Sequence, residues 1–230
     1  MSSMTQLAAI FDMDGTLVDN NPYHLQSWQV LFERHGKPPV TRQKYNESMS
    51  GVPGMVILKE HFGNDYDEEG LQQLYHEKDA IFYEAYEPHI APVNGLERLL
   101  AELKTAGWKL AIASSAAQRN IDFILQHTTI GQYFDVIVNG MRVQQPKPSP
   151  QIFLKAADEL QVQPEHCLVF EDSISGVKAA NSAGMQVVAL TTTHKANELH
   201  PVALAINNYT GLTVQQLTAL FKKDKDERTE

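Results

Sequence analysis

Two pairs of carboxylates come directly after apolar runs of the sequence. Asp12 and Asp14 follow LAAIF, and Glu171 and Asp172 close the run CLVFED. Carboxylates that converge on one place repel one another and raise each other's pKa unless a cation lies among them. Mg²⁺ is the cation expected here, because it prefers oxygen ligands and keeps water and a substrate phosphate in its coordination shell.

Hydroxyl groups and an ammonium occupy comparable places. Ser114 and Ser115 end the run KLAIASS, and Lys147 lies between prolines in PKPSP. Each of them alone has a plain structural reading, as a helix cap or a surface charge. Together with the backbone amides of helix starts expected near residues 114–116 and 173–176, they would hold phosphate oxygens. The combined set predicts phosphoryl transfer, in which one carboxylate attacks phosphorus and another moves a proton.

The elements that must position these residues are short apolar strands separated by helices. Strands are expected at residues 7–11, 109–114, 135–139, 167–171, 186–190 and 203–207. Near-continuous apolar runs of this kind are typical of a parallel sheet covered on both faces, so we predict a doubly wound, Rossmann-like α/β core. Open sheets of this class bind ligands beyond the carboxyl ends of their strands, which is where the reactive side chains fall.

A long helical stretch interrupts the alternation after the first strand. Helices are expected at residues 22–35, 41–48, 53–61 and 67–86. The last of them has an apolar stripe formed by Leu71, Leu74, Ile81, Phe82 and Ala85. We therefore predict an inserted helical cap with hinges near Asp19 and residues 89–93. The expected domains are a discontinuous core of residues 1–18 and 91–221, the cap of residues 19–90, and a charged tail of residues 222–230.

The composition limits the classes of partner. The 230 residues are 43% hydrophobic and carry 28 acidic against 19 basic side chains, a formal net charge of -9. Such a chain can bury a sizeable core, but it offers no basic field for a nucleic acid backbone. Its start, MSSMTQLAAIF, lacks the basic segment and the apolar length of a signal peptide or a membrane span. We expect a cytoplasmic protein with no nucleic acid, membrane or obligate protein partner.

Four segments resemble the successive motifs of the haloacid dehalogenase superfamily. They are FDMDGTLVD, LAIASSA, QPKPSPQIF and VFEDSISGVKAANSAGM. With the helical insertion after the first motif, the likeness covers nearly the whole chain. Within the superfamily, the chain most resembles the subgroup that contains β-phosphoglucomutase and related phosphatases. This resemblance implies a Rossmann-like core with a cap domain, and an enzyme that works through an aspartyl-phosphate intermediate.

The resemblance also implies a role for each motif residue. Asp12 matches the nucleophile and a metal ligand, and Asp14 matches the general acid and base, with its backbone carbonyl on the metal. An acid at the second position favours phosphate esters over haloacids. Asp172 matches the main acidic metal ligand, and Glu171 binds the metal directly or through water. The groups that hold phosphate correspond to Ser114, Ser115 and Lys147.

The cap is expected to choose the substrate. DNNPYHLQSW resembles the first cap helix of the mutase, with His24 in the place of a histidine that senses the sugar phosphate; the alternative is a histidine on the helix surface. The mutase carries a basic residue on each side of a Gly-Val step, whereas this chain reads SMSGVPGMV, with Ser50 and Gly54. NNPYH and LYHEKDAIF are more similar to relatives that hydrolyse small phosphates or pyrophosphate. We therefore predict a Mg²⁺-dependent phosphatase of a small phosphorylated metabolite, a sugar phosphate or pyrophosphate.

Two alternatives stay open. A mutase holds a bisphosphate at both ends, and here its outer phosphate would face a cap rich in Asp and Glu unless Arg42, Lys44 or Lys59 supplies the missing charge. A receiver-like signalling module also combines acids, Mg²⁺, a hydroxyl and a lysine on a doubly wound sheet. Such modules have no helical insertion of this size and no acid two positions after the phosphorylated aspartate, so the enzyme is favoured.

Overall fold

Six parallel strands form the central sheet of the computed structural model, which describes residues 5–227 and the side chains of residues 5–221. Their spatial order is β3-β2-β1-β4-β5-β6. In chain order they are β1 (Ala8–Phe11), β2 (Lys109–Ser114), β3 (Val136–Asn139), β4 (Cys167–Glu171), β5 (Gln186–Leu190) and β6 (Leu204–Ile206). The predicted doubly wound α/β fold is confirmed, and each predicted strand agrees with the observed bounds to within one residue at either end.

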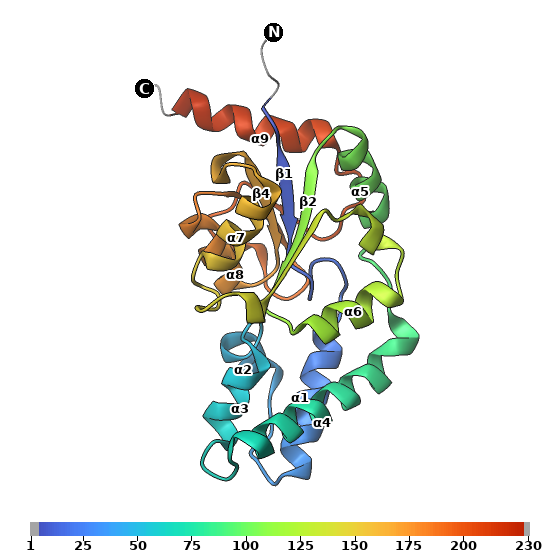
Figure 1. Cartoon of the computed structure of the whole chain (residues 1–230), viewed down its shortest axis with the longest axis vertical. Helices are drawn as coiled ribbons and strands as arrows, with labels where there is room; N and C mark the ends of the chain where they lie inside the picture. The colour runs from blue at the N-terminus through green and yellow to red at the C-terminus, as the bar shows by residue number, and fades with distance from the viewer. Residues whose placement is uncertain (1–4, 228–230) are drawn as a thin grey trace.

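Helices cover both faces of the sheet (Figure 1). One hydrophobic cluster includes residues of α5 (Leu96–Thr105), α6 (Gln118–Gln126) and α9 (Val214–Glu227), and a second includes residues of α7 (Gln151–Leu160) and α8 (Ile174–Ser182). Successive side chains of a strand point to opposite faces, so Phe11 of β1 joins the first cluster and Ile10 the second. Burial on both faces explains why the strand sequences are continuously apolar.

A helical unit lies beyond the carboxyl end of the sheet (Figure 1). It consists of α1 (Asn21–Arg34), α2 (Arg42–Ser48), α3 (Gly54–Phe62) and α4 (Glu68–Tyr86), followed by a short 3-10 turn at Glu87–His89. Pro22 lies in the first turn of α1, and at the start of α4 the Asp67 side chain accepts a hydrogen bond from the Gly70 amide at 2.8 Å. The four helices share a hydrophobic cluster of their own, separate from those of the sheet.

The two connections between the sheet and the helical unit lie side by side. Val18 and Pro92 form an antiparallel β-bridge. Next to it, the Val93 amide donates a hydrogen bond to the Leu17 carbonyl at 2.9 Å. The chain therefore leaves the core and returns to it at one place, and the helical unit is attached to the sheet edge there.

The buried face of α4 differs from the apolar stripe expected for residues 67–86. Ile81 and Ala85, which the sequence pattern placed on the inner face, are only half-buried. Lys78 and Asp79 take inner positions instead, with 4% and 2% of their surface exposed. A pattern of apolar residues does not reveal charged side chains that are buried against partners from other segments. For this reason the predicted inner face of α4 is wrong at Ile81 and Ala85.

The C-terminal helix extends into the segment expected to be a charged tail. α9 continues through Glu227, so residues 222–227 are helical, and residues 228–230 lie outside the described residues. Within residues 5–227, no helix combines the length and the apolar character needed to cross a membrane.

Candidate active site

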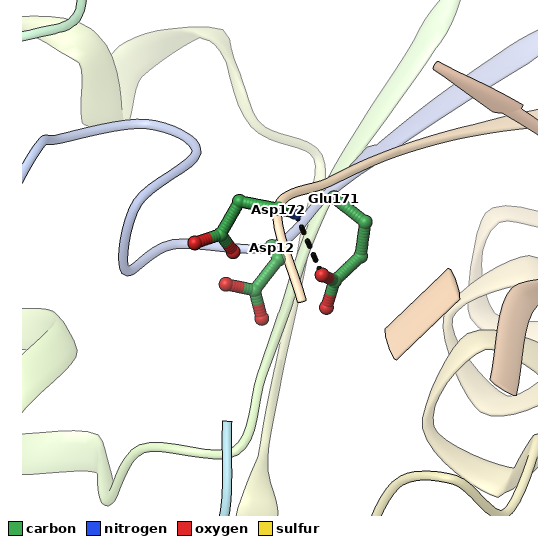
Figure 2. A group of neighbouring side chains, drawn as sticks. All are labelled: Asp12, Glu171 and Asp172. Atoms are coloured by element: carbon green, nitrogen blue, oxygen red, sulfur yellow. Dashed lines mark hydrogen bonds between the residues drawn. The ribbon is translucent and has the colours of Figure 1, made fainter. Parts of the chain in front are cut away.

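Three acidic residues meet at the carboxyl edge of the sheet (Figure 2). Asp12 follows β1, Glu171 ends the neighbouring strand β4, and Asp172 comes next in the chain. One oxygen from each carboxylate lies within 4.8 Å of the others. Their exposed fractions are only 7%, 1% and 2%. The structure thus brings together three of the carboxylates that the sequence analysis selected.

The electrostatics of this cluster are those of a cation site. Burial, together with the charges of Glu171 and Asp14, outweighs the opposing effect of Lys147 and raises the pKa of Asp12 to about 7. Burial, followed by the charges of Glu171 and Asp12, raises the pKa of Asp172 well above its ordinary value. Buried carboxylates at this spacing stay ionised only when a cation lies among them. Since every donor is an oxygen, the residues present fit a hard divalent ion such as Mg²⁺.

Lys147 supplies one positive charge from the core. Its Nζ lies 2.5 Å from Asp12 Oδ1 and 2.7 Å from Glu171 Oε1, and it also donates to the Ala113 carbonyl at 3.3 Å. Burial alone would lower the pKa of Lys147, but the two carboxylates outweigh burial and raise it. All three ammonium protons are engaged, so in this structure Lys147 holds Asp12 and Glu171; its contact with a phosphate stays a prediction.

Glu171 is held from both of its oxygens. Besides Lys147 on Oε1, Oε2 accepts hydrogen bonds from the Asp172 amide at 2.7 Å, the Ser173 amide at 2.6 Å and the Ser173 hydroxyl at 2.9 Å; Figure 2 marks the first of these amides. Residue 176 must be glycine here, because a Cβ would lie 1.7 Å from Glu171 Oε1. The Gly176 amide donates to Ser173 Oγ at 3.1 Å.

The expectation that the amides of residues 173–176 hold phosphate is therefore wrong for Ser173 and Gly176, whose amides already donate to Glu171 and to Ser173 Oγ.

Asp14 faces the helical unit. Its Oδ1 accepts a hydrogen bond from Asn20 Nδ2 at 2.5 Å and lies 3.4 Å from His24 Nε2. Burial raises the pKa of Asp14, but His24, Asn20 and Lys78 together outweigh burial, and the pKa falls below its ordinary value. Asp14 is therefore ionised at neutral pH and ready to accept a proton.

His24 reaches Asp14 from α1. Its side chain is 12% exposed, and its ring stacks on Phe82 with the centroids 4.0 Å apart. Nδ1 lies 2.9 Å from Lys78 Nζ. With the Lys78 ammonium as donor, the ring proton is on Nε2, which faces Asp14. The alternative of a surface histidine is wrong.

The sequence analysis missed two charged residues of α4 that complete this wall. Lys78 Nζ lies 3.5 Å from Asp79 Oδ1, and Asp79 Oδ2 accepts from Arg119 Nε at 2.8 Å. Arg119 belongs to α6 of the core, so this ion pair joins the helical unit to the sheet domain. A signal was available: residue 78 falls four positions after Leu74 and four before Phe82, both buried, so helical periodicity places it on the same face.

The predicted phosphate-binding hydroxyls lie on the opposite wall. Ser114 ends β2, next to β1. Its Oγ accepts a hydrogen bond from the Ala116 amide at 3.1 Å, which leaves the hydroxyl proton available as a donor. The cavity that contains Asp12 and Asp14 is also lined by Ser114, Ser115 and Ala116.

This cavity, of about 80 Å³, lies between the sheet edge and the helical unit. Ser50 and Gly54 line it, as does Lys78. All the helical-unit residues that line it are described, and none of them is acidic. The expectation that an outer phosphate would face Asp and Glu of the cap is therefore wrong for the cavity wall.

The basic residues suggested from the sequence are not on this wall. Lys44 lies over the ring of Phe32, with Nζ 5.9 Å from the centroid, and Lys59 pairs with Glu68 at 3.3 Å. Arg42 does not line the cavity either. Among the described residues of the helical unit, Lys78 is the lysine that reaches the cavity.

Comparisons with known proteins agree with this chemistry. A family model described as haloacid dehalogenase-like hydrolase matches residues 9–190. A phosphorylated carbohydrates phosphatase of Thermotoga maritima is 37% identical over 183 residues, which are 78% of this chain and 82% of that protein. A beta-phosphoglucomutase of Bacillus subtilis is 34% identical over 191 residues, 80% of this chain and 82% of that protein. The crystal structure of a beta-phosphoglucomutase from Clostridium difficile superposes with a TM-score of 0.85 at 28% identity, covering 95% of this chain and 98% of that one.

Proposed function

The chain belongs to the haloacid dehalogenase-like hydrolase family, and we propose that it is a Mg²⁺-dependent phosphatase of a small phosphorylated metabolite, such as a sugar phosphate or pyrophosphate. The observation that supports this most is the position of Asp12. It lies at the end of the central strand, 2.5 Å from Lys147 and in the cavity lined by Ser114. Members of this family are enzymes, so the receiver-like alternative is set aside. We place the reaction in the cytoplasm, where phosphorylated metabolites are made.

Asp12 is the proposed nucleophile. Lys147 binds Oδ1, and the other oxygen forms a bond to phosphorus while the bond from phosphorus to the leaving oxygen breaks, which gives an aspartyl phosphate. Asp14 protonates the leaving oxygen and then takes a proton from the water that releases phosphate. Mg²⁺ would be held by Asp12, Asp172 and the Asp14 carbonyl, with Glu171 binding it directly or through water. There it would offset the negative charge of these carboxylates and of the phosphate.

The remaining polar groups hold the reactants. The Ser114 hydroxyl is the proposed donor to the transferring phosphoryl group, with Ser115 beside it. A contact between Lys147 and phosphate would require the ammonium to release one of its present partners, of which the Ala113 carbonyl, at 3.3 Å, is the weakest. Because its pKa is lowered, Asp14 is in the ionised form that can accept a proton from water. For the first step Asp14 must carry a proton, which enters from solvent; the neutral His24 ring, whose Nε2 lies 3.4 Å from Asp14 Oδ1, orients the carboxylate.

The cavity wall favours hydrolysis over isomerisation. A mutase needs charge-assisted contacts to a second phosphate, which are worth about 1.5 to 3 kcal/mol each. Here the basic group of the helical unit on that wall, among described residues, is Lys78, and it is already shared between His24 and Asp79. Mutase activity is the second candidate, because Lys78 and the likeness to beta-phosphoglucomutases both support it.

The deciding experiment compares two products. β-Glucose 1-phosphate, with a trace of β-glucose 1,6-bisphosphate and Mg²⁺, should give inorganic phosphate faster than glucose 6-phosphate, measured by phosphate release and by a coupled glucose 6-phosphate dehydrogenase assay. Isomerisation that outruns release would identify a mutase. A screen of phosphorylated metabolites and pyrophosphate, ranked by kcat/KM, would then find the substrate. Asp12→Asn, purified in parallel, serves as the inactive control, and activity above about one per cent of wild type would contradict the assigned nucleophile.

A further inference from the structure

A buried chain of hydrogen bonds runs from the helical unit to Asp172. The Tyr45 hydroxyl of α2 donates to Asn21 Oδ1 at 3.0 Å, and Asn21 Nδ2 lies 3.1 Å from Asp172 Oδ2. Asn21 Nδ2 also lies 2.6 Å from Thr193 Oγ1, and the Thr193 hydroxyl donates to the same Asp172 oxygen. Tyr45 and Asn21 are 4% and 9% exposed. Two donors therefore hold Asp172 Oδ2, one from each part of the molecule.

These contacts leave one side of the Asp172 carboxylate for a cation. Both donors act on Oδ2, and the described side chains place no hydrogen bond on Oδ1. The carboxylates of Glu171 and Asp12 lie close to Asp172, each with an oxygen within 4.8 Å of it, and repel its negative charge. A carboxylate in such surroundings keeps one orientation only when neighbouring donors fix it, and donors of this kind commonly set the affinity of a metal ligand.

Tyr45 decides which end of the Asn21 amide faces Asp172. Its hydroxyl proton goes to Asn21 Oδ1, and that directs Nδ2 to the carboxylate. Without Tyr45, the amide could rotate and turn its oxygen toward the negative charge. The backbone leaves room for this contact at Gly15, where φ is +76° and a Cβ would lie 2.0 Å from Asp172 Oδ2 and 2.4 Å from Asn21 Nδ2.

We propose that Asn21 is a positioning residue that presents Asp172 to the divalent cation, with Tyr45 fixing the orientation of the Asn21 amide. The inference rests on the metal site of the proposed function. Because Tyr45 and Asn21 belong to the helical unit and Asp172 to the core, the docked position of the helical unit raises the affinity for the cation. By reciprocity, the bound cation favours the docked position.

Calorimetric titration of the full chain with Mg²⁺ tests this without any turnover. Asn21→Ala should weaken Mg²⁺ binding about 10- to 100-fold, and Tyr45→Phe, which removes a single oxygen, should weaken it by a smaller factor of at least about 3. Tyr66→Phe is the matched control, because it also removes one hydroxyl from the helical unit. The Tyr66 hydroxyl lies 2.9 Å from His35 Nδ1 and is not part of the hydrogen bonds that lead to Asp172. The Tyr66→Phe variant should bind Mg²⁺ like the wild type.

A second titration tests the coupling between the two parts. Saturating inorganic phosphate, added as a probe of the proposed phosphate site, should tighten Mg²⁺ binding in the wild type and tighten it less in Asn21→Ala and Tyr45→Phe. Unfolding curves in EDTA check that each variant is folded; if Asn21→Ala is not, Tyr45→Phe carries the test. Wild-type affinity in a folded Asn21→Ala or Tyr45→Phe would overturn the proposal. Absence of Mg²⁺ binding by the wild type would instead overturn the metal site of the proposed function.

Discussion

Each wall of the active site buries one lysine, and the two lysines are held in opposite ways. On the core wall, Lys147 lies between Asp12 and Glu171, and these carboxylates outweigh burial and raise its pKa. On the wall of the helical unit, burial lowers the pKa of Lys78, and Asp79 and Asp14 compensate only in part. Lys78 also has a neutral partner, His24, at 2.9 Å.

The positive charge of Lys147 is therefore fixed, whereas that of Lys78 can change with its surroundings. Lys147 is compensated by neighbours of its own sheet edge, so its charge does not depend on the helical unit. Lys78 and Arg119 of the core both pair with Asp79. The charge that offsets Lys78 therefore changes when the helical unit and the core separate. A docked anion would complete the compensation of Lys78. Under the proposed function, the core wall would carry out the reaction and the wall of the helical unit would respond to the substrate.

Replacing the core lysine should have the largest effect. Lys147→Met leaves Asp12 and Glu171 without their cation, which should cost about 3 to 5 kcal/mol of unfolding free energy and at least about 10³-fold in kcat. Urea unfolding in EDTA and phosphate release measure the two. Lys155→Met, at a half-buried surface lysine 3.5 Å from Glu159, is the control and should change stability by less than about 1 kcal/mol. An unchanged stability for Lys147→Met would show that the neighbouring carboxylates are neutral.

Replacing the lysine of the helical unit should affect activity without the loss of stability. Lys78→Met removes an ammonium whose burial is not fully compensated, so the unfolding free energy should stay the same or rise. The rate should fall about 10²-fold, because the charge facing the substrate is lost. Steady-state kinetics and urea unfolding test this, with Lys44→Met as the control outside the cavity. If Lys78→Met destabilises as much as Lys147→Met, the contrast between the two walls is wrong.

The ion pair between the two parts should have an intermediate effect. Arg119→Gln leaves buried Asp79 to Lys78 alone, so the charge of Lys78 is cancelled and KM should rise about 10-fold. A double-mutant cycle with Asp79→Asn should give a coupling energy of about 1 to 3 kcal/mol. Arg142→Gln, which breaks the exposed pair with Glu159 at 2.7 Å, is the control. Additive effects of Arg119→Gln and Asp79→Asn would mean that the pair does not act as a unit.

The pH dependence of stability should show the smallest effect. The pKa of Asp12 is about 7 in the folded protein against an ordinary value of 3.8, so between these values the folded state holds a proton that the unfolded state has lost. This contribution to stability is therefore lost as pH rises from about 4 to about 7. In EDTA, the Tm of wild type minus that of Asp12→Asn should fall by a few degrees over this range. A difference that rises with pH would contradict the raised pKa.

The sequence predicted the core wall well because its chemistry follows from strand order. Carboxylates at the ends of apolar runs must meet at one edge of a parallel sheet, and Asp12, Glu171 and Asp172 do so. Lys147 stood out because it lies between prolines after a strand. What the sequence could not indicate is that all three of its protons are taken, since this depends on side-chain geometry.

The wall of the helical unit was less predictable because its residues act through partners far away in the chain. Lys78 meets His24 across 54 positions, and Arg119 meets Asp79 across 40. Each residue alone is typical of a helix surface. Asn21 was missed for a similar reason: at the start of a helix it resembles an ordinary capping residue, whereas its amide lies on Asp172, 151 positions away.

The paired connections at Val18 and Pro92 have a consequence for the history of such proteins. When the entry and exit points of an inserted segment lie together, the segment can be lengthened, replaced or removed without moving the host's own ends. The helices here also have a hydrophobic cluster of their own. A lineage can therefore trade one helical module for another while inheriting the same phosphate chemistry. Grafting residues 19–90, the predicted cap, onto a related core would test whether this unit selects the substrate.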